Sequence, residues 1–197
     1  MTGSGPVSAD REGPPPDIDI SVAHVARVYD YWLGGKDNFA ADRAAAEAAM
    51  REDPNVVEGV RGNRAFLARA VRYLAGQAGV RQFLDIGTGI PAADNTHEDD
   101  PAGVIRQLMD AVPPGSYLAI SHPANDINSP GVGRLASRLN ELMPMKLRFR
   151  ARAEVARFFD GLELVEPGLV RAPGWRPDSD ADLANPAAVW AGVARKN

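Results

Sequence analysis

The segment "RQFLDIGTGIPAADNTHEDDPAGVIRQL", residues 81–108, joins two patterns that rarely follow each other directly. Its first half is typical of a buried β-strand that ends in a glycine turn, the arrangement with which many nucleotide-binding sheets begin. Such a sheet would continue through a long helix into a second strand that ends in an acidic residue. Here Pro101 comes only twelve residues after Gly89 and begins a different amphipathic helix. The second strand and its acidic residue, which would complete the expected site, therefore do not follow the glycine turn in the sequence.

Helical patterns precede this stretch and mixed patterns follow it. We expect helices within 22–33, 39–52 and 54–75, with Asp37 or Asn38 capping the second and Asp53-Pro54 starting the third. The third carries one apolar stripe, made by Phe66, Leu67, Ala70, Val71 and Leu74. Further on, the sequence predicts helices at 101–112, 131–143 and 150–161, strands at 116–122, 162–170 and 187–196, and a loop at 173–186.

This alternation of helices and strands predicts an α/β fold with a mainly parallel sheet, in which a loop joins the last two strands as an antiparallel pair at one edge. We divide the chain into a disordered lead (1–17), a helical extension (18–80) and a sheet-containing core (81–197).

The composition excludes several classes of protein. The 197 residues contain no cysteine, which excludes disulfides and thiolate metal sites and is consistent with a cytoplasmic location. The formal net charge of −4 provides no basic surface for nucleic acid or an anionic membrane. No apolar run approaches the ~20 residues of a membrane span, and the N-terminus lacks the apolar region of a secretory signal. Three widely separated histidines show no metal-ligand spacing, so we expect no metal site.

The turn at Asp85–Gly89 is the strongest chemical signal. The strand would place Asp85 at the carboxyl edge of the sheet, and Gly87 and Gly89 would let the backbone approach a ligand closely. The third glycine of the dinucleotide fingerprint is replaced by Ala92, which argues against a nicotinamide cofactor. A glycine turn that only ends a core strand is the simpler alternative.

Two other stretches are open to two interpretations each. "ARVYDYWLGGKDNFAADR", residues 26–43, is either a solvated helix–turn–helix or a lid that excludes water from a site. It is not a phosphate-binding loop, because the glycine spacing and the Ser or Thr after Lys36 are missing. Ser121-His122 follows a predicted strand, either lining a cleft or facing solvent.

Taken together, "ARVYDYWLGGKDNFAADR", "NRAFLARAVRYLA", "RQFLDIGTGIPAADNTHE" and the C-terminal stretches resemble a family of S-adenosylmethionine-dependent methyltransferases long catalogued as a domain of unknown function. The resemblance extends from Asp17 to Lys196. It implies a class I, Rossmann-like methyltransferase sheet with a helical N-terminal extension, a small-molecule substrate and S-adenosylmethionine as cofactor. It names neither the methyl acceptor nor a catalytic residue.

The resemblance also implies the cofactor-binding residues. Asp85 would lie by the amino group of the methionine part, with Gly87, Thr88 and Gly89 passing beneath the cofactor. Asn95 and His97 match a family motif just after this turn. The N-terminal segment would roof the pocket and bring these residues near cofactor or substrate: Arg27, Tyr29, Tyr31, Lys36, Asp37 and Asn38.

One departure from the family answers the question raised by residues 81–108. Family members continue after "NTHE" through the second, third and fourth strands, whereas here Glu98 directly precedes Asp99. At ~30 residues per βαβ unit, about eighty residues are missing. The sheet would be truncated to about four strands, in the order first, fifth, seventh, sixth. The first strand would become a new edge and favour self-association. We expect an impaired methyltransferase; the alternative is a degenerate, non-catalytic member of the family that acts as a binding protein.

Overall fold

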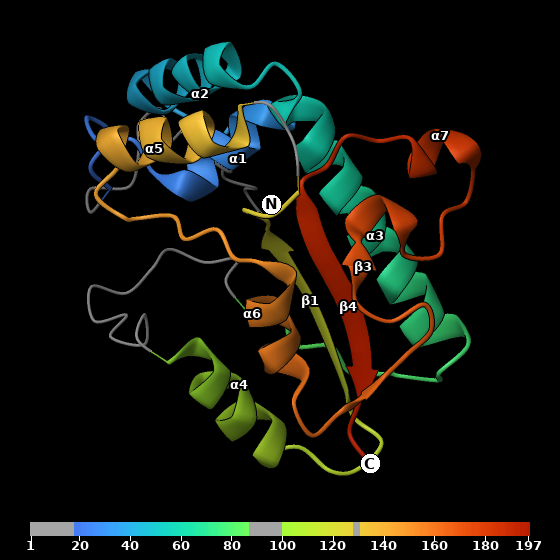
Figure 1. The fold of residues 1–197 in the computed structure, drawn as a ribbon. Helices are drawn as coiled ribbons and strands as arrows, with labels where there is room; N and C mark the ends of the chain where they lie inside the picture. The colour runs from blue at the N-terminus through green and yellow to red at the C-terminus, as the bar shows by residue number, and fades with distance from the viewer. Residues whose placement is uncertain (1–17, 87–99, 128–130) are drawn as a thin grey trace, which may run out of the picture.

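The computed structural model describes residues 18–86, 100–127 and 131–197. Its sheet contains β1 (Tyr117–Pro123), β2 (Glu163–Leu164), β3 (Val170–Arg171) and β4 (Val189–Arg195). The order is β1-β4-β2, and β3 also pairs with β4 (Figure 1). Every strand pair is antiparallel, and Ile120 of β1 lies opposite Gly192 of β4. The sheet therefore corresponds to the fifth, seventh and sixth strands of the expected order, with the sixth divided in two.

The predicted first strand is wrong for the described part of the stretch. Residues 81–86 form no strand, and all six are exposed. Phe83, Leu84 and Ile86 are 52%, 81% and 63% exposed. The prediction of a mainly parallel sheet fails with it, since this strand would have supplied the parallel pairing. An apolar run forms a buried strand where neighbouring strands and covering helices exist, and no described strand pairs with this segment.

The helices follow the sequence pattern more closely. In chain order they are α1 (Val25–Trp32), α2 (Ala40–Glu52), α3 (Val56–Gly76), α4 (Pro101–Asp110), α5 (Val132–Leu142), α6 (Arg152–Ala156) and α7 (Asp180–Leu183), with 3-10 turns at Arg157–Phe159 and Ala172–Gly174. The short α7 and the second 3-10 turn lie where the sequence predicted only loop. The strand predicted at 162–170 is interrupted at Pro167-Gly168 and gives β2 and β3.

Two predicted helix caps are corrected. Asp37 and Asn38 do not cap α2; the N-cap is Phe39, whose amide donates to Asp42 Oδ2 at 2.9 Å. The carboxylate three residues into the helix thus replaces the cap that the sequence placed before it. The N-cap of α3 is Asn55, although Asp53 Oδ1 still accepts from the Asn55 amide at 3.0 Å.

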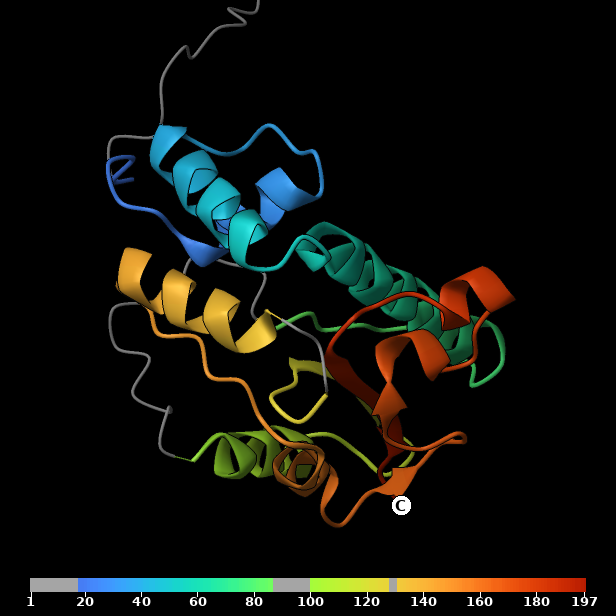
Figure 2. The same cartoon turned by 45° about the horizontal axis from the view of Figure 1, so that its top comes forward.

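Three apolar clusters hold the described elements together. In the first, α5 packs against α1 and α2, so residues 132–142 join the N-terminal helices in one layer (Figure 2). The second places α3 against one face of the sheet, with Phe66, Ala70 and Leu74 buried against Trp175. Leu67 and Val71 of the predicted stripe are 39% and 42% exposed. The third places α4 and α6 on the other side of the sheet.

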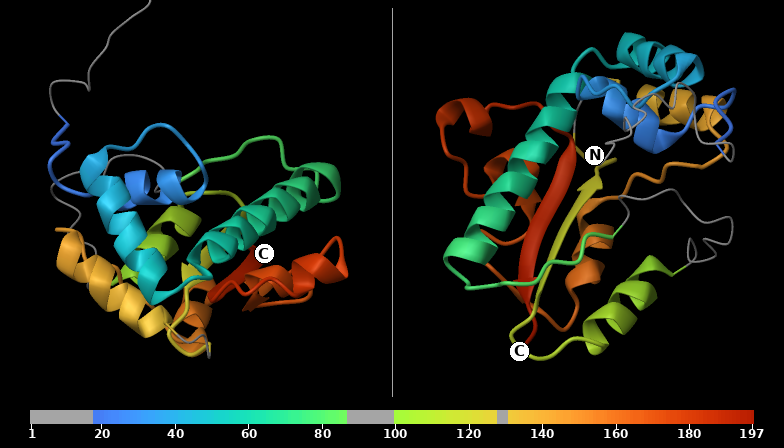
Figure 3. Two further views of the ribbon diagram at one scale, coloured as in Figure 1. Left: turned by 90° about the horizontal axis from the view of Figure 1, so that it is seen from above. Right: turned by 180° about the vertical axis from the view of Figure 1, so that it is seen from behind.

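The segment between α3 and residue 86 crosses the sheet on the face that carries α3 (Figure 3). Ala78 and Val80 pack into the cluster of that face. The chain then continues past β1, the end strand of the sheet. Among the described helices, none is long and apolar enough to cross a membrane.

Candidate functional site

The predicted cofactor turn is described only at its start. Asp85 is exposed and belongs to no helix or strand. Five predicted residues lie outside the described residues: Gly87, Thr88, Gly89, Asn95 and His97. The described structure therefore leaves the turn itself as a prediction.

The predicted roof is folded, and most of its polar side chains have partners within the chain. Arg27 Nε contacts Asp42 Oδ2 at 2.8 Å, and its Nη2 donates to the carbonyls of Asp19 and Val22. Asp42 is fully buried and also accepts from the amides of His24 and Phe39. This arrangement fixes the start of α1 against α2, so Arg27 has a structural role here.

The turn between α1 and α2 is organised around one carboxylate. Asp30 Oδ2 accepts from the Asp37 amide at 3.0 Å and from Asn38 Nδ2 at 2.9 Å. A Cβ on Gly35 would lie 1.9 Å from Asp30 Oδ1, so a side chain there would force the Asp30 carboxylate to move. The polar residues of this stretch thus largely stabilise a tight turn. Lys36 is exposed on that turn.

Tyr29 faces the third helix rather than solvent. Asn63 Nδ2 donates to Tyr29 Oη at 3.1 Å, and the Arg64 guanidinium lies 5.5 Å from the Tyr29 ring centroid. Asn63 Oδ1 is buried and finds no partner in the described parts of the chain. A buried unpartnered acceptor is unusual, so a donor from outside the described residues, whether from the rest of the chain or from a ligand, would satisfy it. Sequence reasoning missed Asn63, although it lies in the "NRAFL" stretch that supported the resemblance.

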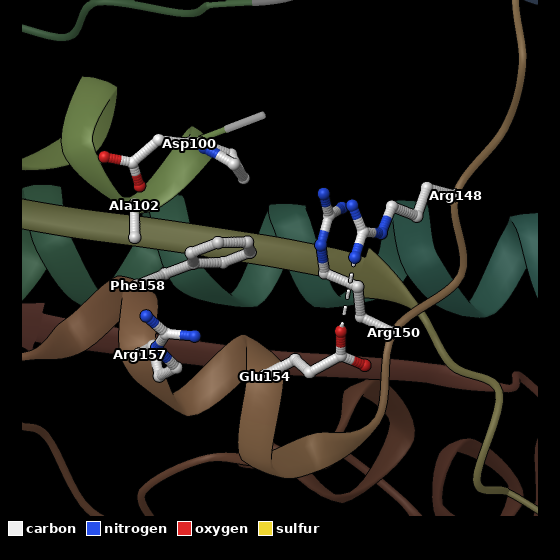
Figure 4. Close-up of a pocket in the computed structure, with 8 residues that line it drawn as sticks. Asp100, Ala102, Arg148, Arg150, Glu154, Arg157 and Phe158 are labelled. Carbon is white, nitrogen blue, oxygen red and sulfur yellow. Dashed lines mark ion pairs between the residues drawn. The ribbon is translucent and has the colours of Figure 1, made fainter. Parts of the chain in front are cut away.

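A separate pocket of about 110 Å³ lies between α4 and the 148–158 segment (Figure 4). Arg148, Arg150, Glu154, Arg157 and Phe158 line it together with the start of α4 at 100–102. Among the described residues predicted to bind the cofactor, none lines it. The signal in the sequence was the alternation in "RFRAR", which places Arg148 and Arg150 on one side of an extended segment.

The two residues of the Ser121-His122 pair lie in different environments. Ser121 is exposed, whereas His122 is partly buried beside this pocket, with its ring centroid 5.8 Å from that of Phe158. Arg150 Nη1 lies 2.9 Å from His122 Nε2. Burial, reinforced by the Arg150 guanidinium, lowers the pKa of His122 to about 4, so the ring is neutral at pH 7.

The described residues do not enclose S-adenosylmethionine. Pockets for ligands of that size usually have volumes of ~300–1,000 Å³, and the pocket beside α4 has about 110 Å³. The exposed Asp85 carboxylate and the Tyr29–Asn63 pair are isolated contacts.

The chain is similar to known proteins over most of its length. Residues 11–98 and 98–197 match the S-adenosyl methyltransferase family model, in two stretches that meet at residue 98. A crystal structure of a DUF574 family protein from Streptomyces avermitilis has a TM-score of 0.80 at 32% identity, covering 91% of this chain and 100% of that one. A Thermobifida fusca protein provisionally assigned as a methyltransferase has a TM-score of 0.79 at 31% identity, covering 93% of this chain and 98% of that one. No curated protein matches significantly. Because the family model covers more than half of the sequence, this chain belongs to the S-adenosyl methyltransferase family.

Proposed function

We propose that this chain is a cytoplasmic, S-adenosylmethionine-dependent methyltransferase acting on a small molecule, and that its cofactor affinity is low in the 197-residue form. The family match, which includes the Asp85–Gly89 turn and both flanks, is the observation that carries the proposal. In such a reaction the protein mainly supplies proximity, orientation and exclusion of water.

The roof supports a cofactor site of this kind. Helices α1 and α2 pack on α3 and α5, so Tyr29 and Asn63 are held in fixed positions. We propose that the unpartnered Asn63 Oδ1, Lys36 and Asn38 face cofactor or substrate when the site is complete. Arg27 and Asp42 act on the same site only by fixing the roof.

We expect low cofactor affinity because the second and third strands of the family are missing from this sequence. Family members hold the ribose hydroxyls and the adenine with acids on the second and third strands. A hydrogen bond to a charged group contributes ~1.5–3 kcal/mol, so losing two lowers the binding free energy by about 3–6 kcal/mol. At ~1.4 kcal/mol per tenfold, the dissociation constant rises roughly a hundredfold to ten-thousandfold. The exposed Phe83, Leu84 and Ile86 are consistent with a site that lacks its neighbours.

Calorimetric titration with S-adenosylhomocysteine, and separately with NADH, tests the proposal. We expect weak binding of S-adenosylhomocysteine, in the sub-millimolar range or above, and none of NADH. Asp85→Asn should abolish the remaining heat, while the exposed control Asp178→Asn should leave it unchanged.

Two results would overturn the proposal in different ways. Unchanged affinity in Asp85→Asn would show that the site is elsewhere. No heat at millimolar S-adenosylhomocysteine would favour the alternative, a non-catalytic family member that binds a partner.

A further inference from the structure

The pocket beside α4 holds more positive charge than its own acids neutralise. Asp100 Oδ1 accepts from the Gly103 amide at 2.9 Å, and its other oxygen lies 3.4 Å from Arg106 Nη2, so it serves as the cap of α4. Glu154 Oε2 accepts from the Ala151 amide at 2.9 Å, and only the long 3.8 Å contact of its Oε1 reaches Arg148. Both carboxylates are therefore committed largely to the backbone.

Three arginine side chains line this pocket. The Arg148 and Arg150 guanidinium groups lie side by side, with the Arg148–Glu154 ion pair below them (Figure 4). Arg157 lines the same pocket and forms no ion pair within 18–86, 100–127 and 131–197. Burial, with repulsion from Arg148, lowers the pKa of Arg150, which indicates positive charge crowded into a partly dehydrated place.

The floor of the pocket holds Arg150 in place without neutralising it. Phe158 is 7% exposed, and the Arg150 Cζ lies 5.6 Å from its ring centroid. His122 is neutral, and its Nε2 lies 2.9 Å from Arg150 Nη1 and 3.1 Å from the Arg148 carbonyl oxygen. With Nε2 unprotonated it accepts from Arg150, and with Nε2 protonated it donates to the Arg148 carbonyl instead. The guanidinium is thus oriented from two sides and keeps donors for a further partner, because its five N–H groups exceed what these contacts use.

We propose that this pocket binds one oxyanionic group, a phosphate or a carboxylate, of a small molecule. Arginine pairs with both groups through two parallel hydrogen bonds. The volume of about 110 Å³ is that of about three to four waters, at ~30 Å³ each. It suits a single such group and is too small for a whole nucleotide cofactor. Its described lining contains none of Asp85, Arg27, Tyr29, Lys36 and Asn38, and the proposal does not depend on the proposed function.

The test is titration of the 197-residue chain with inorganic phosphate, glycerol phosphate and acetate at constant ionic strength, without any methyl donor. We expect dissociation constants near one millimolar. Arg157→Gln should weaken binding about tenfold, the lower end of what a hydrogen bond to a charged group contributes. Arg61→Gln is the matched control, since it removes the same charge from an exposed ion pair on α3. Glycerol phosphate that binds more tightly than inorganic phosphate would show that the rest of the small molecule also contributes; equal affinities would confine recognition to the oxyanion.

Proton NMR of the histidine rings gives a second readout. A bound oxyanion favours the protonated form of a neighbouring ring, so phosphate should raise the pKa of His122. His24 lies on the N-terminal layer and serves as the internal control. The proposal fails if Arg157→Gln and Arg61→Gln weaken binding equally, if both histidines shift by the same amount, or if none of the three anions binds.

Discussion

At the scale of single residues, Asp42 is the polar group on which the N-terminal layer depends most. Burial alone would raise the pKa of this carboxyl, but hydrogen bonds from Arg27 and from the Phe39 and His24 amides outweigh burial and lower it. Removing one partner of a buried, hydrogen-bonded charge pair is strongly destabilising. We expect Asp42→Asn to lower the free energy of unfolding by about 3 kcal/mol, measured by urea denaturation at pH 7.

The matched control is Glu47→Gln, on the exposed face of the same helix, which should change stability by less than about 0.5 kcal/mol. The folded pKa of Asp42 is depressed, so its contribution is present above the ordinary value of 3.8 and is lost as the pH falls through the folded pKa. Equal stability of the two variants at pH 7 would contradict this role.

His122 is partly buried in its neutral form, whereas Asp42 is buried in its charged form, and the pH window of His122 is different. Its pKa is lowered from 6.5 to about 4 by burial and by Arg150, with Arg148 and Glu154 also nearby. Between these values the unfolded chain binds a proton that the folded chain does not, so stability is complete above pH 6.5 and falls towards pH 4. We expect about 2 kcal/mol less stability at pH 5 than at pH 7. His122→Gln should make the two urea midpoints more nearly equal; an unchanged difference would assign the pH dependence to other groups.

At the scale of elements, the sequence predicted the helices and strands whose own residues carry a clear pattern and whose packing partners are present. Helix α2 is rich in strong helix formers, α3 carries an apolar stripe, and β1 and β4 are apolar runs bounded by turn residues. The predicted strand at 81–86 failed because its stability is not local: "QFLDI" needs strands on both sides. The cap of α2 was mispredicted for a smaller reason: the Asp42 carboxylate accepts from the Phe39 amide, and Asn38 Nδ2 donates to Asp30 instead of capping the helix.

The exposed apolar side chains at 83–86 lead to a prediction about association. The edge strand of the described sheet is β1, whereas the sequence predicted that the first strand would be the edge. Apolar side chains are nevertheless exposed at 83–86, in the segment that passes β1. Burying a leucine contributes ~1.5–3 kcal/mol. We expect concentration-dependent self-association in sedimentation velocity, weakened about tenfold or more by Leu84→Lys.

Leu183→Lys on α7 is the matched control, because Leu183 is also exposed, at 54%, but lies on another element. A chain that stays monomeric at all concentrations, or one in which both variants act equally, would exclude residues 83–86 as the contact.

At the scale of the whole molecule, the sequence predicted the family and the helical extension, but not the arginine pocket. That pocket brings together the start of α4, the 148–150 segment and α6, which are separated by about fifty residues. Sequence periodicity and short motifs do not predict that segments so far apart in the chain line one pocket. Likewise, Asn63 becomes a candidate only once Tyr29 is seen to contact it. Motifs thus identified the chemistry that the family shares, whereas tertiary packing determined which side chains remain available to a ligand.

The join between Glu98 and Asp99 is the position at which the missing strands can be restored. If the missing strands account for both weak cofactor binding and exposed apolar surface, one change should correct both. Inserting a family-type segment of about eighty residues there should restore S-adenosylhomocysteine affinity by roughly a hundredfold or more. The same insertion should give a single monomeric species in sedimentation. A flexible Gly/Ser insert of equal length is the control, and it should restore neither property. Tight binding by the 197-residue chain itself would contradict the prediction and would mean that the N-terminal roof holds the cofactor without those strands.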